Sequence, residues 1–497
     1  MVSAYTERFS LKHPEEFYIG GDWVKPLGSQ RFDIVYPVTE KVIGSCPAAS
    51  VADIERAVAA AREAFDNGEW PRLTFDERAD LLERAGQIMM RRASEFSECW
   101  TLEMGCAVGL AGPGGYAPGA IFSYYANMIR GRTFEVVRPQ SRREGVGIVV
   151  KEAVGVVAAI TPWNAPSSLP CKIFAPALAN GCTVIHKPAP ETPLDAWLLA
   201  ECLEEAGIPP GVFNIVPADR EVGDHLIRHP GVDKVSLIGS AAAGRHIASV
   251  VGGRLGRFSL ELGGKSPAVI FDDIDPDVVI PRLIPHFTMN AGQMCAGLTR
   301  IIVPEASHDK WADAIAAGLE ALKVGDPYDP ETDYGPIAMK RQYDRVMEYM
   351  DIGRGEGARI ITGGDRPKDL NLGYYIAPTL FSGTNDMRVA QEEIFGPVAT
   401  IVTHKGVEDA IRIANDSEYG LNGAVYTADA DLAYRVSRRV RAGNMTHNDW
   451  VNDIEFPFGG FKNSGIGRDG GPEGLALYQE TKVVFMDAVP PSLQPVA

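Results

Sequence analysis

Two short segments carry residues suited to covalent chemistry through sulfur. Glu261-Leu262-Gly263-Gly264-Lys265 places a carboxylate beside two glycines, and Gly292-Gln293-Met294-Cys295-Ala296 places a thiol among small residues. The thiol can attack a carbonyl carbon, and the carboxylate can activate the water that later releases the product. Upstream, Thr161-Pro162-Trp163-Asn164 offers an amide for the oxyanion, and Gly239-Ser240 is typical of a cofactor-binding helix start. These four parts together favour an oxidoreductase that acts on an aldehyde.

The bulk composition is that of an ordinary globular enzyme. A chain of 497 residues exceeds what one hydrophobic core supports and should divide into two or three domains. Hydrophobic residues make up 45% and charged residues 23%. The formal net charge of -17 disfavours nucleic acid or an anionic membrane surface as a partner.

Cysteine usage and apolar runs indicate a cytoplasmic protein that does not span a membrane. The seven cysteines are scattered and form no CxxC pair, which fits a reducing compartment. Residues Met1 to Ser10 are polar and lack the apolar region of a signal peptide. The strongest apolar run, Ala153 to Ile160, is far shorter than the ~20 residues of a membrane helix and predicts a buried strand. The nine histidines form no HExxH or comparable spacing, so no metal site is predicted.

The first part of the chain predicts turns and helices. Val51 to Phe65 has helical apolar spacing after the possible cap Ser50. Phe75 to Glu103 is predicted to continue as one amphipathic helix. Gly112-Pro113-Gly114-Gly115, followed by Pro118-Gly119, is the most glycine- and proline-rich stretch and is interpreted as a surface loop.

Between residues 150 and 262, short β-branched runs alternate with helical stretches. This alternation predicts a mainly parallel, doubly wound sheet. Ligands bind beyond the carboxyl ends of such strands, and Asn164, Lys187 and Ser240 each follow a predicted strand. The predicted strands are Val154 to Ile160, Thr183 to His186, Val212 to Val216 and Val235 to Ile238, and the helices include Pro193 to Ala206 and Arg220 to Arg228.

A second α/β region should run from about 263 to 463. Phe134 to Val150 has the alternation of a hairpin, and Thr481 to Met486 is a further strand. Neither has an obvious pairing partner in its own neighbourhood. Unpaired edges of this kind invite pairing with another subunit, so an oligomer is predicted.

The motifs, taken in order, resemble the NAD(P)+-dependent aldehyde dehydrogenase superfamily over roughly residues 15 to 490. Beyond the segments above, the resemblance rests on Lys187-Pro188-Ala189, Glu392-Glu393-Ile394-Phe395-Gly396-Pro397 and Pro457-Phe458-Gly459-Gly460. It implies an α/β fold with a Rossmann-like parallel-sheet cofactor domain, a second α/β catalytic domain and a small β oligomerisation element. The implied divisions are 1–129 with 151–262 for dinucleotide binding, 263–463 for catalysis, and 130–150 with 479–497 for assembly into a homodimer or homotetramer.

The resemblance implies a role for each of three catalytic residues. Cys295 is the nucleophile, and its thiol pKa is expected below the free value of ~8.5. Asn164 and the Cys295 backbone N–H hold the oxyanion of the thiohemiacetal. Hydride transfer to the nicotinamide leaves a thioester, and Glu261 activates the water that hydrolyses it. Relatives that pass the acyl group to coenzyme A usually lack this glutamate, so a free acid is the favoured product.

The same resemblance implies a set of cofactor residues. NAD is the expected cofactor, with NADP as the alternative. Many NAD-preferring relatives carry a glutamate three residues after the ribose-binding lysine, where this chain has Pro190, with Glu191 one position further. Glycines 263 and 264 are expected to let the chain approach the cofactor closely. The cofactor set is Ile160, Trp163, Lys187, Gly223, Gly239, Ser240, Leu262, Gln342, Glu393 and Phe395.

The predicted substrate pocket is wider and less aromatic than in simple aliphatic-aldehyde enzymes. Its residues are Ala165, Ser168, Leu169 and Phe458, with alanine where many relatives have an aromatic side chain. Lys172 stands one place before the family's common lysine and is given no catalytic role. Asp469 replaces a frequent glutamate, and its part in a proton relay is left open.

The predicted substrate is a small-molecule aldehyde. Two alternatives remain to a dehydrogenase that oxidises such an aldehyde to the free acid. One is a semialdehyde or CoA-acylating dehydrogenase of the same fold. The other is a non-catalytic structural relative, which the presence of Cys295 and Glu261 disfavours. The sequence leaves the physiological aldehyde undetermined.

Overall fold

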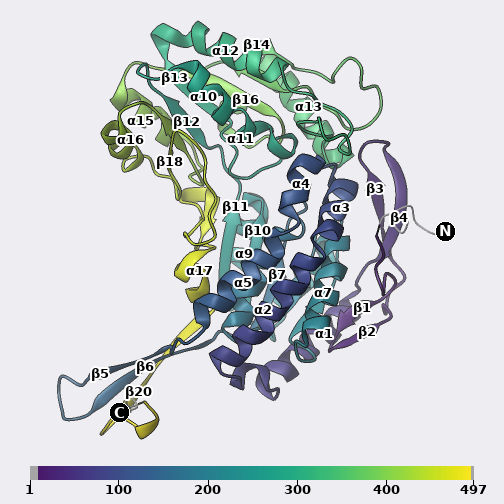
Figure 1. Ribbon diagram of the computed structural model, residues 1–497, viewed down its shortest axis with the longest axis vertical. Coiled ribbons are helices and arrows are strands. Elements are labelled where there is room, and N and C mark those ends of the chain that lie inside the picture. The colour runs from purple at the N-terminus through teal and green to yellow at the C-terminus, as the bar shows by residue number, and fades with distance from the viewer. Residues whose placement is uncertain (1–8, 494–497) are drawn as a thin grey trace.

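The computed structural model describes residues 9–493 and contains two sheet-centred lobes with a projecting three-stranded sheet (Figure 1). The expectations for the first eight residues, and for the end of the predicted assembly element at 494–497, lie outside the described residues. Within 9–493, no helix combines the length and apolar character needed to cross a bilayer. The α/β class with largely parallel sheets is as predicted.

The first lobe holds a six-stranded sheet in the order β19-β11-β10-β7-β8-β9. Its strands pair in parallel except for β19, which runs antiparallel to β11. The strands are β7 (Val156–Ile160), β8 (Thr183–Lys187), β9 (Phe213–Ile215), β10 (Lys234–Gly239), β11 (Arg257–Leu262) and β19 (Gly465–Ile466). From β7 the chain adds β8 and β9 on one side and then β10 and β11 on the other. The carboxyl ends of β7 and β10 therefore form a topological switch point, where such sheets bind ligands.

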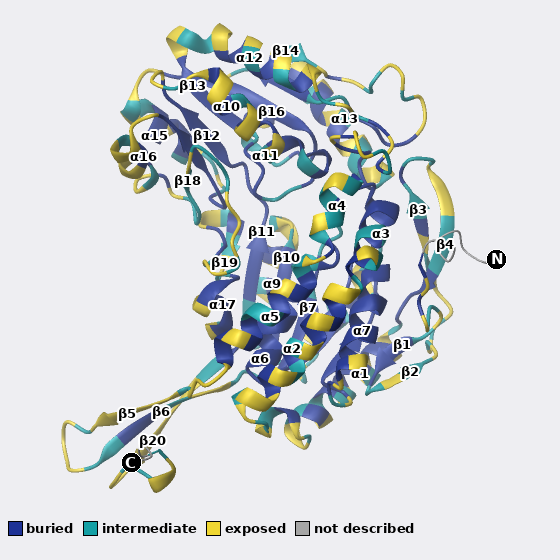
Figure 2. Ribbon diagram, in the orientation of Figure 1, coloured by how far each residue is buried: buried dark blue, intermediate teal, exposed yellow. Residues whose placement is uncertain are grey.

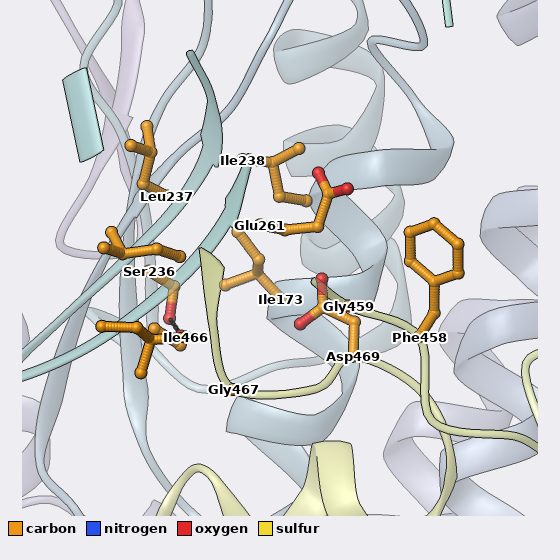
Figure 3. Close-up of a pocket in the computed structure, with 12 residues that line it drawn as sticks. Ile173, Ser236, Leu237, Ile238, Glu261, Phe458, Gly459, Ile466, Gly467 and Asp469 are labelled. Carbon is orange, nitrogen blue, oxygen red and sulfur yellow. Dashed lines mark hydrogen bonds between the residues drawn. The ribbon is translucent and has the colours of Figure 1, made fainter. Parts of the chain in front are cut away.

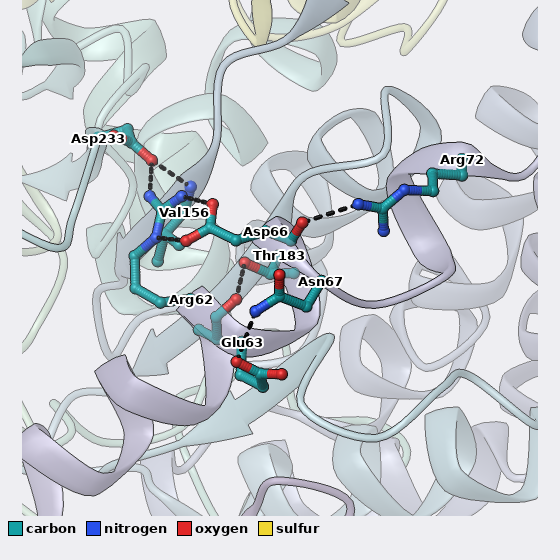
Figure 4. A network of polar contacts seen from close by, with 9 residues as sticks. Arg62, Glu63, Asp66, Asn67, Arg72, Val156, Thr183 and Asp233 are labelled. Atoms are coloured by element: carbon teal, nitrogen blue, oxygen red, sulfur yellow. Dashed lines mark hydrogen bonds and ion pairs between the residues drawn. The ribbon is translucent and has the colours of Figure 1, made fainter.

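Helices pack against this sheet and bury its strands (Figure 2). The helices of this lobe are α1 (Val51–Asp66), α2 (Phe75–Arg91), α3 (Ala93–Met104), α4 (Val108–Gly114), α5 (Ala117–Ile129), α6 (Ser168–Ala179), α7 (Leu194–Ala206), α8 (Arg220–Arg228), α9 (Ala241–Gly253) and α17 (Gly471–Ala476). Ser50 caps α1 in a reciprocal capping box with Asp53, as its spacing predicted. At the other end of α1, Arg62 pairs with Asp66 and with Asp233, which also accepts a hydrogen bond from the Val156 N–H (Figure 4). This network ties α1 to the start of β7.

The glycine-rich segment at 112–119 is helical, so the predicted surface loop is wrong. It forms the end of α4 and the start of α5. A Cβ on Gly115 would lie 2.2 Å from the Ala93 carbonyl oxygen, and one on Gly119 would lie 2.6 Å from that of Gly86. The glycines therefore serve close helix packing rather than a turn, a long-range requirement that composition does not reveal.

The helix predicted over Phe75 to Glu103 is also corrected, because it breaks at Arg92 into α2 and α3. The Arg92 side chain pairs with Glu95 and with the buried Glu201 of α7. The amphipathic pattern of the sequence continues across the break at Arg92, so the pattern alone does not predict the break.

The second lobe holds a seven-stranded sheet in the order β14-β15-β16-β13-β12-β17-β18. Its pairs are parallel except for β14 with β15. The strands are β12 (Pro267–Ile270), β13 (Arg300–Pro304), β14 (Arg359–Thr362), β15 (Thr379–Ser382), β16 (Val398–His404), β17 (Ala424–Tyr426) and β18 (Thr446–His447). The helices are α10 (Pro276–Leu283), α11 (Pro285–Thr288), α12 (His308–Glu320), α13 (Lys340–Gly355), α14 (Arg388–Gln391), α15 (Val407–Asn415) and α16 (Ala430–Ser437). The chain crosses from the first sheet to the second between β11 and β12.

The predicted hairpin and terminal strand pair with each other within this chain. The hairpin strands β5 (Glu135–Pro139) and β6 (Val146–Ala153) are antiparallel, and β20 (Gln479–Met486) pairs antiparallel with β6. The sheet projects from the first lobe (Figure 1). The partner of the terminal strand thus lies far away in the sequence, outside its own neighbourhood, and β5 and β20 are still edges of the sheet. Two further hairpins near the start are β1 (Phe17–Ile19) with β2 (Asp22–Val24) and β3 (Arg31–Tyr36) with β4 (Lys41–Pro47).

Candidate active site

Cys295 lies in the loop that enters β13, after a turn with unusual backbone geometry. Asn290 and Ala291 have φ values of 56° and 53°, in the left-handed region that such residues rarely adopt. Gly292 has φ 70°, and a Cβ there would lie 2.1 Å from the Gly396 carbonyl oxygen, so glycine is required. Strain of this kind persists where surrounding structure holds it, and it is common at functional sites.

Cys295 differs from the other cysteines in its exposure. The described residues include all seven cysteines, of which six are buried and Cys295 is partly accessible. Burial of the sulfur raises the pKa of Cys295 well above its ordinary value, and the carboxyl groups of Glu261 and Glu393 add to the rise. The expected lowering of this pKa is therefore wrong, because the positive charge of Lys172 is outweighed by desolvation and two acidic neighbours.

Glu261 stands near the carboxyl end of β11 and interacts with the thiol of Cys295. Burial raises the pKa of Glu261 to about 8, and the negative charge of Asp469 contributes to the rise. The contact with Cys295 and the charge of Lys172 oppose it. The buried Oε1 of Glu261 has no hydrogen-bond partner within residues 9–493. The carboxyl group therefore has a free acceptor site at a pKa suited to proton exchange near neutrality.

Asn164 lies buried after β7, next to the cysteine loop. Its Nδ2 donates a hydrogen bond of 2.9 Å to the Gln293 carbonyl, two residues before Cys295. Its own carbonyl accepts bonds from Trp100 Nε1 at 3.0 Å and Asn290 Nδ2 at 2.9 Å. The backbone of Asn164 is therefore held by two side chains and its amide by the bond to Gln293, and an amide carries two N–H donors, so one remains available.

The two glycines after Glu261 make room for a second carboxylate. A Cβ on Gly263 would lie 2.1 Å from Glu393 Oε2, and the Gly264 N–H donates to Glu393 Oε1 at 3.1 Å. A Cβ on Gly264 would also lie 2.9 Å from the Cys295 carbonyl oxygen. The two glycines therefore let this segment approach Glu393 and the cysteine loop closely.

Lys172 and Asp469 stand beside the thiol and the carboxylate. Lys172, on α6, lies 5.4 Å from the ring centre of Phe458, and its charge acts on Cys295, Glu261 and Asp469. Burial raises the pKa of Asp469 to about 6. A small cavity of about 10 Å³, room for about one water, is lined by both Glu261 and Asp469 (Figure 3). Lys172, which the sequence interpretation gave no catalytic role, thus lies close to the thiol and the carboxylate.

A cleft of about 930 Å³ lies at the switch point of the first sheet. The N-terminus of α9 opens into it, with Ser240 as the capping residue. Apolar side chains of α8 and α9, including Ile227 and Ile247, line one part of it. The size, the helix N-terminus and the apolar wall fit a dinucleotide, because helix N-termini bind phosphates and apolar walls accept a base.

Six of the ten predicted cofactor residues line this cleft, namely Ile160, Trp163, Lys187, Gly223, Gly239 and Ser240. The other four lie outside its lining. Leu262 packs against Gly244 of α9, and Glu393 lies against the glycine pair. The lining residues that the sequence did not single out include Thr161, Pro162, Asp219, Arg220, His246 and Arg341.

The start of α13 holds the remaining predicted residues in place. Gln342 Nε2 donates to the carbonyls of Ile394 and Phe395, both at 2.9 Å, and Arg345 donates to that of Glu393 at 2.8 Å. Phe395 has a φ of 63° and meets Trp163 edge to face at 5.3 Å. The 393–395 segment is therefore fixed against the wall of the cleft.

The predicted pocket residues fall in two apolar clusters. Ala165 and Leu169 pack with Trp100 and Met104. Phe458 packs with Cys295, Ala296, Leu421 and Trp450. Helix α6 links the clusters, since it begins at Ser168 and places Leu169 and Lys172 one turn apart. Trp450, which the sequence did not single out, adds an aromatic wall beside the sulfur.

The described residues contain no group of three or more His, Cys, Asp or Glu placed to hold a metal ion. A dinucleotide cleft at a switch point, beside a thiol paired with a carboxylate, defines the class of dinucleotide-dependent oxidoreductases that act through sulfur.

Comparison with known proteins assigns the chain to a family. The model of the aldehyde dehydrogenase family matches residues 23–484. Geranial dehydrogenase of Castellaniella defragrans is 42% identical over 474 residues, 95% of this chain and 98% of that protein. An aldehyde dehydrogenase of Mycobacterium tuberculosis, crystallised with NAD+, has a TM-score of 0.93 at 40% identity, covering 96% of this chain and 99% of that one. A mutant of aldehyde dehydrogenase C from Pseudomonas syringae, crystallised with NAD+ and octanal, has a TM-score of 0.92 at 36% identity, covering 96% and 98%.

The chain belongs to the aldehyde dehydrogenase family and is an NAD(P)+-dependent aldehyde dehydrogenase. The family resemblance, the fold class and the reaction class predicted from the sequence are thereby confirmed.

Proposed function

We propose that Cys295 is the nucleophile of this dehydrogenase and Glu261 its general base. The observation that carries the proposal is the pairing of the one partly accessible cysteine among the described residues with a buried carboxyl group that has an unpartnered oxygen. Because both groups have raised pKa values, Glu261 can accept the thiol proton as sulfur attacks the carbonyl carbon. The attack produces a thiohemiacetal whose oxygen carries the developing negative charge.

Asn164 is proposed to stabilise that charge together with the Cys295 backbone N–H. The remaining N–H of its amide is preorganised by the bond to Gln293. Losing one such donor typically costs about 3–4 kcal/mol of transition-state stabilisation. The bound nicotinamide supplies the hydride acceptor, and a thioester is left on Cys295. Glu261 then removes a proton from the water that hydrolyses the thioester to the free carboxylic acid.

Asp469 and Lys172 are proposed to carry that proton away from Glu261. The cavity shared by Glu261 and Asp469 has room for a bridging water (Figure 3). Burial raises the pKa of Asp469 to about 6, and the positive charge of Lys172 lowers it. Glu261, with a pKa of about 8, and Asp469 can therefore exchange a proton near neutral pH.

NAD is the cofactor, and we assign its contacts to the residues that the family pattern indicated. Ser240 and the α9 N-terminus suit the pyrophosphate. Lys187 and Gly223 lie together in the cleft, with Lys187 Cε 3.0 Å from the position of a Gly223 Cβ, and suit the adenosine end. Glu393 and Phe395, held by Gln342, suit the nicotinamide riboside, with Trp163 against Phe395. Ile160 and Gly239 end the two strands of the switch point, and Leu262 supports α9.

The substrate is proposed to be an apolar aldehyde. Ala165, Ser168, Leu169 and Phe458 are assigned to the pocket, and Trp450 joins them because it packs, as Cys295 does, against the cluster that contains Phe458. The relatives named for geranial and crystallised with octanal act on or bind aldehydes of this kind. Apolar walls of this type select by burial of hydrocarbon surface.

The domain division proposed for the chain follows the two sheets. Residues 9–129 with 151–262 bind the dinucleotide, 263–463 carry the nucleophile, and the projecting sheet of β5, β6 and β20 forms a homodimer or homotetramer. Six successive residues of β20 are exposed, so neither face of the strand is packed within the chain. A cytoplasmic location is favoured by seven cysteines without a disulfide within the described residues.

Replacement of Cys295 by alanine tests the proposal. We expect NADH formation from octanal or geranial to fall to background while the circular dichroism spectrum is retained. Replacement of the buried Cys171 by alanine is the control and should retain turnover. Normal turnover by the Cys295→Ala protein would defeat the assignment.

Product analysis separates the alternative reactions. Wild-type enzyme should release the free acid at the same rate with or without coenzyme A. Acyl-CoA as the main product would establish the acyl-transferring alternative, and absence of any turnover would support the non-catalytic one.

A further inference from the structure

An ion pair crosses the dinucleotide cleft between two separate elements. Arg341, in the first turn of α13, places Nη1 2.5 Å from Oε1 of Glu191, which follows β8. Both residues line the cleft, together with Pro190 and Lys187. The Arg341 side chain is 67% exposed and that of Glu191 20%, so the pair lies at the mouth of the cleft.

The position of this pair along a dinucleotide follows from the ends of the cleft. The α9 N-terminus, at Ser240, marks the phosphates. Trp163 and the adjoining Phe395 lie toward Asn164 and Cys295, so the reacting ring belongs there. The opposite end, at Lys187, Gly223 and Glu191, is left for the adenosine.

The charges at the adenosine end are arranged in an alternating cluster. The carboxylates of Glu191 and Asp219 both face Lys187 and favour its charged form, while burial disfavours it. Arg341 neutralises Glu191 from the other side of the cleft. Two cations, Lys187 and Arg341, therefore flank the adenosine end. The guanidinium of Arg341 is paired with the carboxylate of Glu191.

A guanidinium binds carboxylates and phosphates through the same planar fork of donors. Exposed ion pairs are weak, because solvent screens them and two long side chains must be held still. A dianionic phosphate placed near Arg341 can therefore displace the Glu191 carboxylate. NADP+ carries such a phosphate on its adenosine ribose, and NAD+ has a hydroxyl group there.

We propose that Arg341 is a binding residue for the 2′-phosphate of NADP+, with Glu191 as the built-in competitor that gives NAD+ its advantage. This inference rests on the proposed cofactor cleft. The enzyme then uses both cofactors: NAD+ binds with the ion pair closed, and NADP+ binds with it opened. Pro190, which fixes the chain before Glu191, leaves the acid one residue further along and within reach of Arg341.

Binding of two cofactor fragments tests the inference without turnover. The dissociation constants of 5′-ADP and 2′,5′-ADP are measured by calorimetry on the full-length protein. In Arg341→Gln, the affinity ratio of 2′,5′-ADP to 5′-ADP should fall about tenfold, because a charge-assisted phosphate contact is lost. In Glu191→Gln, the same ratio should rise about tenfold, because the competing and repelling carboxylate is gone.

Lys340→Gln provides the matched control. Lys340 precedes Arg341 on the same helix. It forms an ion pair with Asp344 and is not among the residues that line the cleft. Its loss removes one positive charge nearby and should leave the ratio within about twofold. The ratio of kcat/KM for NADP+ to that for NAD+ should follow the fragment ratios in all three variants.

The outcomes separate this inference from the proposed function. If the protein binds 5′-ADP and the ratio is unchanged in Arg341→Gln, Arg341 is not a phosphate residue and the inference fails alone. If Lys340→Gln changes the ratio as much as Arg341→Gln does, only the general charge matters, and the inference also fails. If the protein binds neither fragment, the cofactor cleft itself is wrong.

Discussion

The chemistry at Cys295 depends on where one proton resides. The charges of Glu261, Glu393 and Lys172 act on the sulfur, and desolvation raises the pKa of the thiol and of both carboxyl groups. Two acidic groups in contact titrate as a pair. In the proposed mechanism, the thiol proton moves to Glu261 as the substrate is attacked and must leave Glu261 before water is activated. The neighbouring carboxyl groups and the burial of the sulfur thus explain why the pKa of Cys295 is raised, whereas the sequence predicted a lowered value.

Glu261→Gln should separate the two halves of the reaction. We expect a burst of NADH of about one equivalent per site, followed by a slow steady state, because thioester hydrolysis loses its base. Rapid-mixing absorbance at the NADH band measures both phases. A full steady-state rate without a burst would remove Glu261 from this role.

Neighbouring charges should shift the pH profile in opposite directions. Glu261 acts as a base only above its pKa of about 8, so hydrolysis should rise with pH through that value. Asp469 raises that pKa and Lys172 lowers it. Asp469→Asn should therefore move the inflection to lower pH, and Lys172→Met should move it to higher pH, in steady-state rates measured from pH 6 to 10. If both variants moved the inflection in the same direction, the charges of Asp469 and Lys172 would not act through the pKa of Glu261.

At the scale of elements, glycines in the 109–119 segment have two different structural roles. Gly115, in the turn between α4 and α5, comes close to the backbone of α3, and Gly119 allows α5 to touch the backbone of α2. Gly109 and Gly112, in α4, have nothing within 4 Å of an added Cβ. The first kind is a packing requirement, and the second only lowers helix propensity.

Two alanine substitutions should therefore have opposite effects on stability. Gly119→Ala should lower the melting temperature, because overpacking of this kind costs about 1–3 kcal/mol. Gly112→Ala should raise it slightly, by about 0.5–1 kcal/mol of helix propensity. Differential scanning fluorimetry measures the melting temperatures of both variants. Equal changes in melting temperature would mean that α5 does not pack tightly against α2 at Gly119.

At the scale of the molecule, the projecting sheet is the part that the chain leaves uncovered. Val136, Val483 and Phe485 expose apolar side chains on it. Much of β5 and β20 has the colour of exposed residues in Figure 2. Exposed apolar patches on a protein of net charge -17 are typical of an interface rather than of solvent contact.

Phe485→Lys should reduce the molecular mass measured by light scattering after size exclusion, because a charge would be buried between subunits. Phe485 is 66% exposed in the single chain. Leu255→Lys, at a residue that is 84% exposed elsewhere, is the matched control and should leave the mass unchanged. An equal mass for both variants would place the interface elsewhere.

The sequence by itself determined the family, the α/β class, the reaction class and the candidate trio, because Cys295, Glu261 and Asn164 stand in local motifs. It also determined α1, whose cap and apolar period lie within 17 residues. Only the tertiary structure decided the helices at 112–119, the pairing of β20 with β6, the nearness of Lys172 and Trp450, and the ion pair of Arg341 with Glu191. It alone decided the direction of the Cys295 pKa as well. Motifs record local chemistry, whereas close packing, desolvation and charge pairing depend on residues that are distant in the chain.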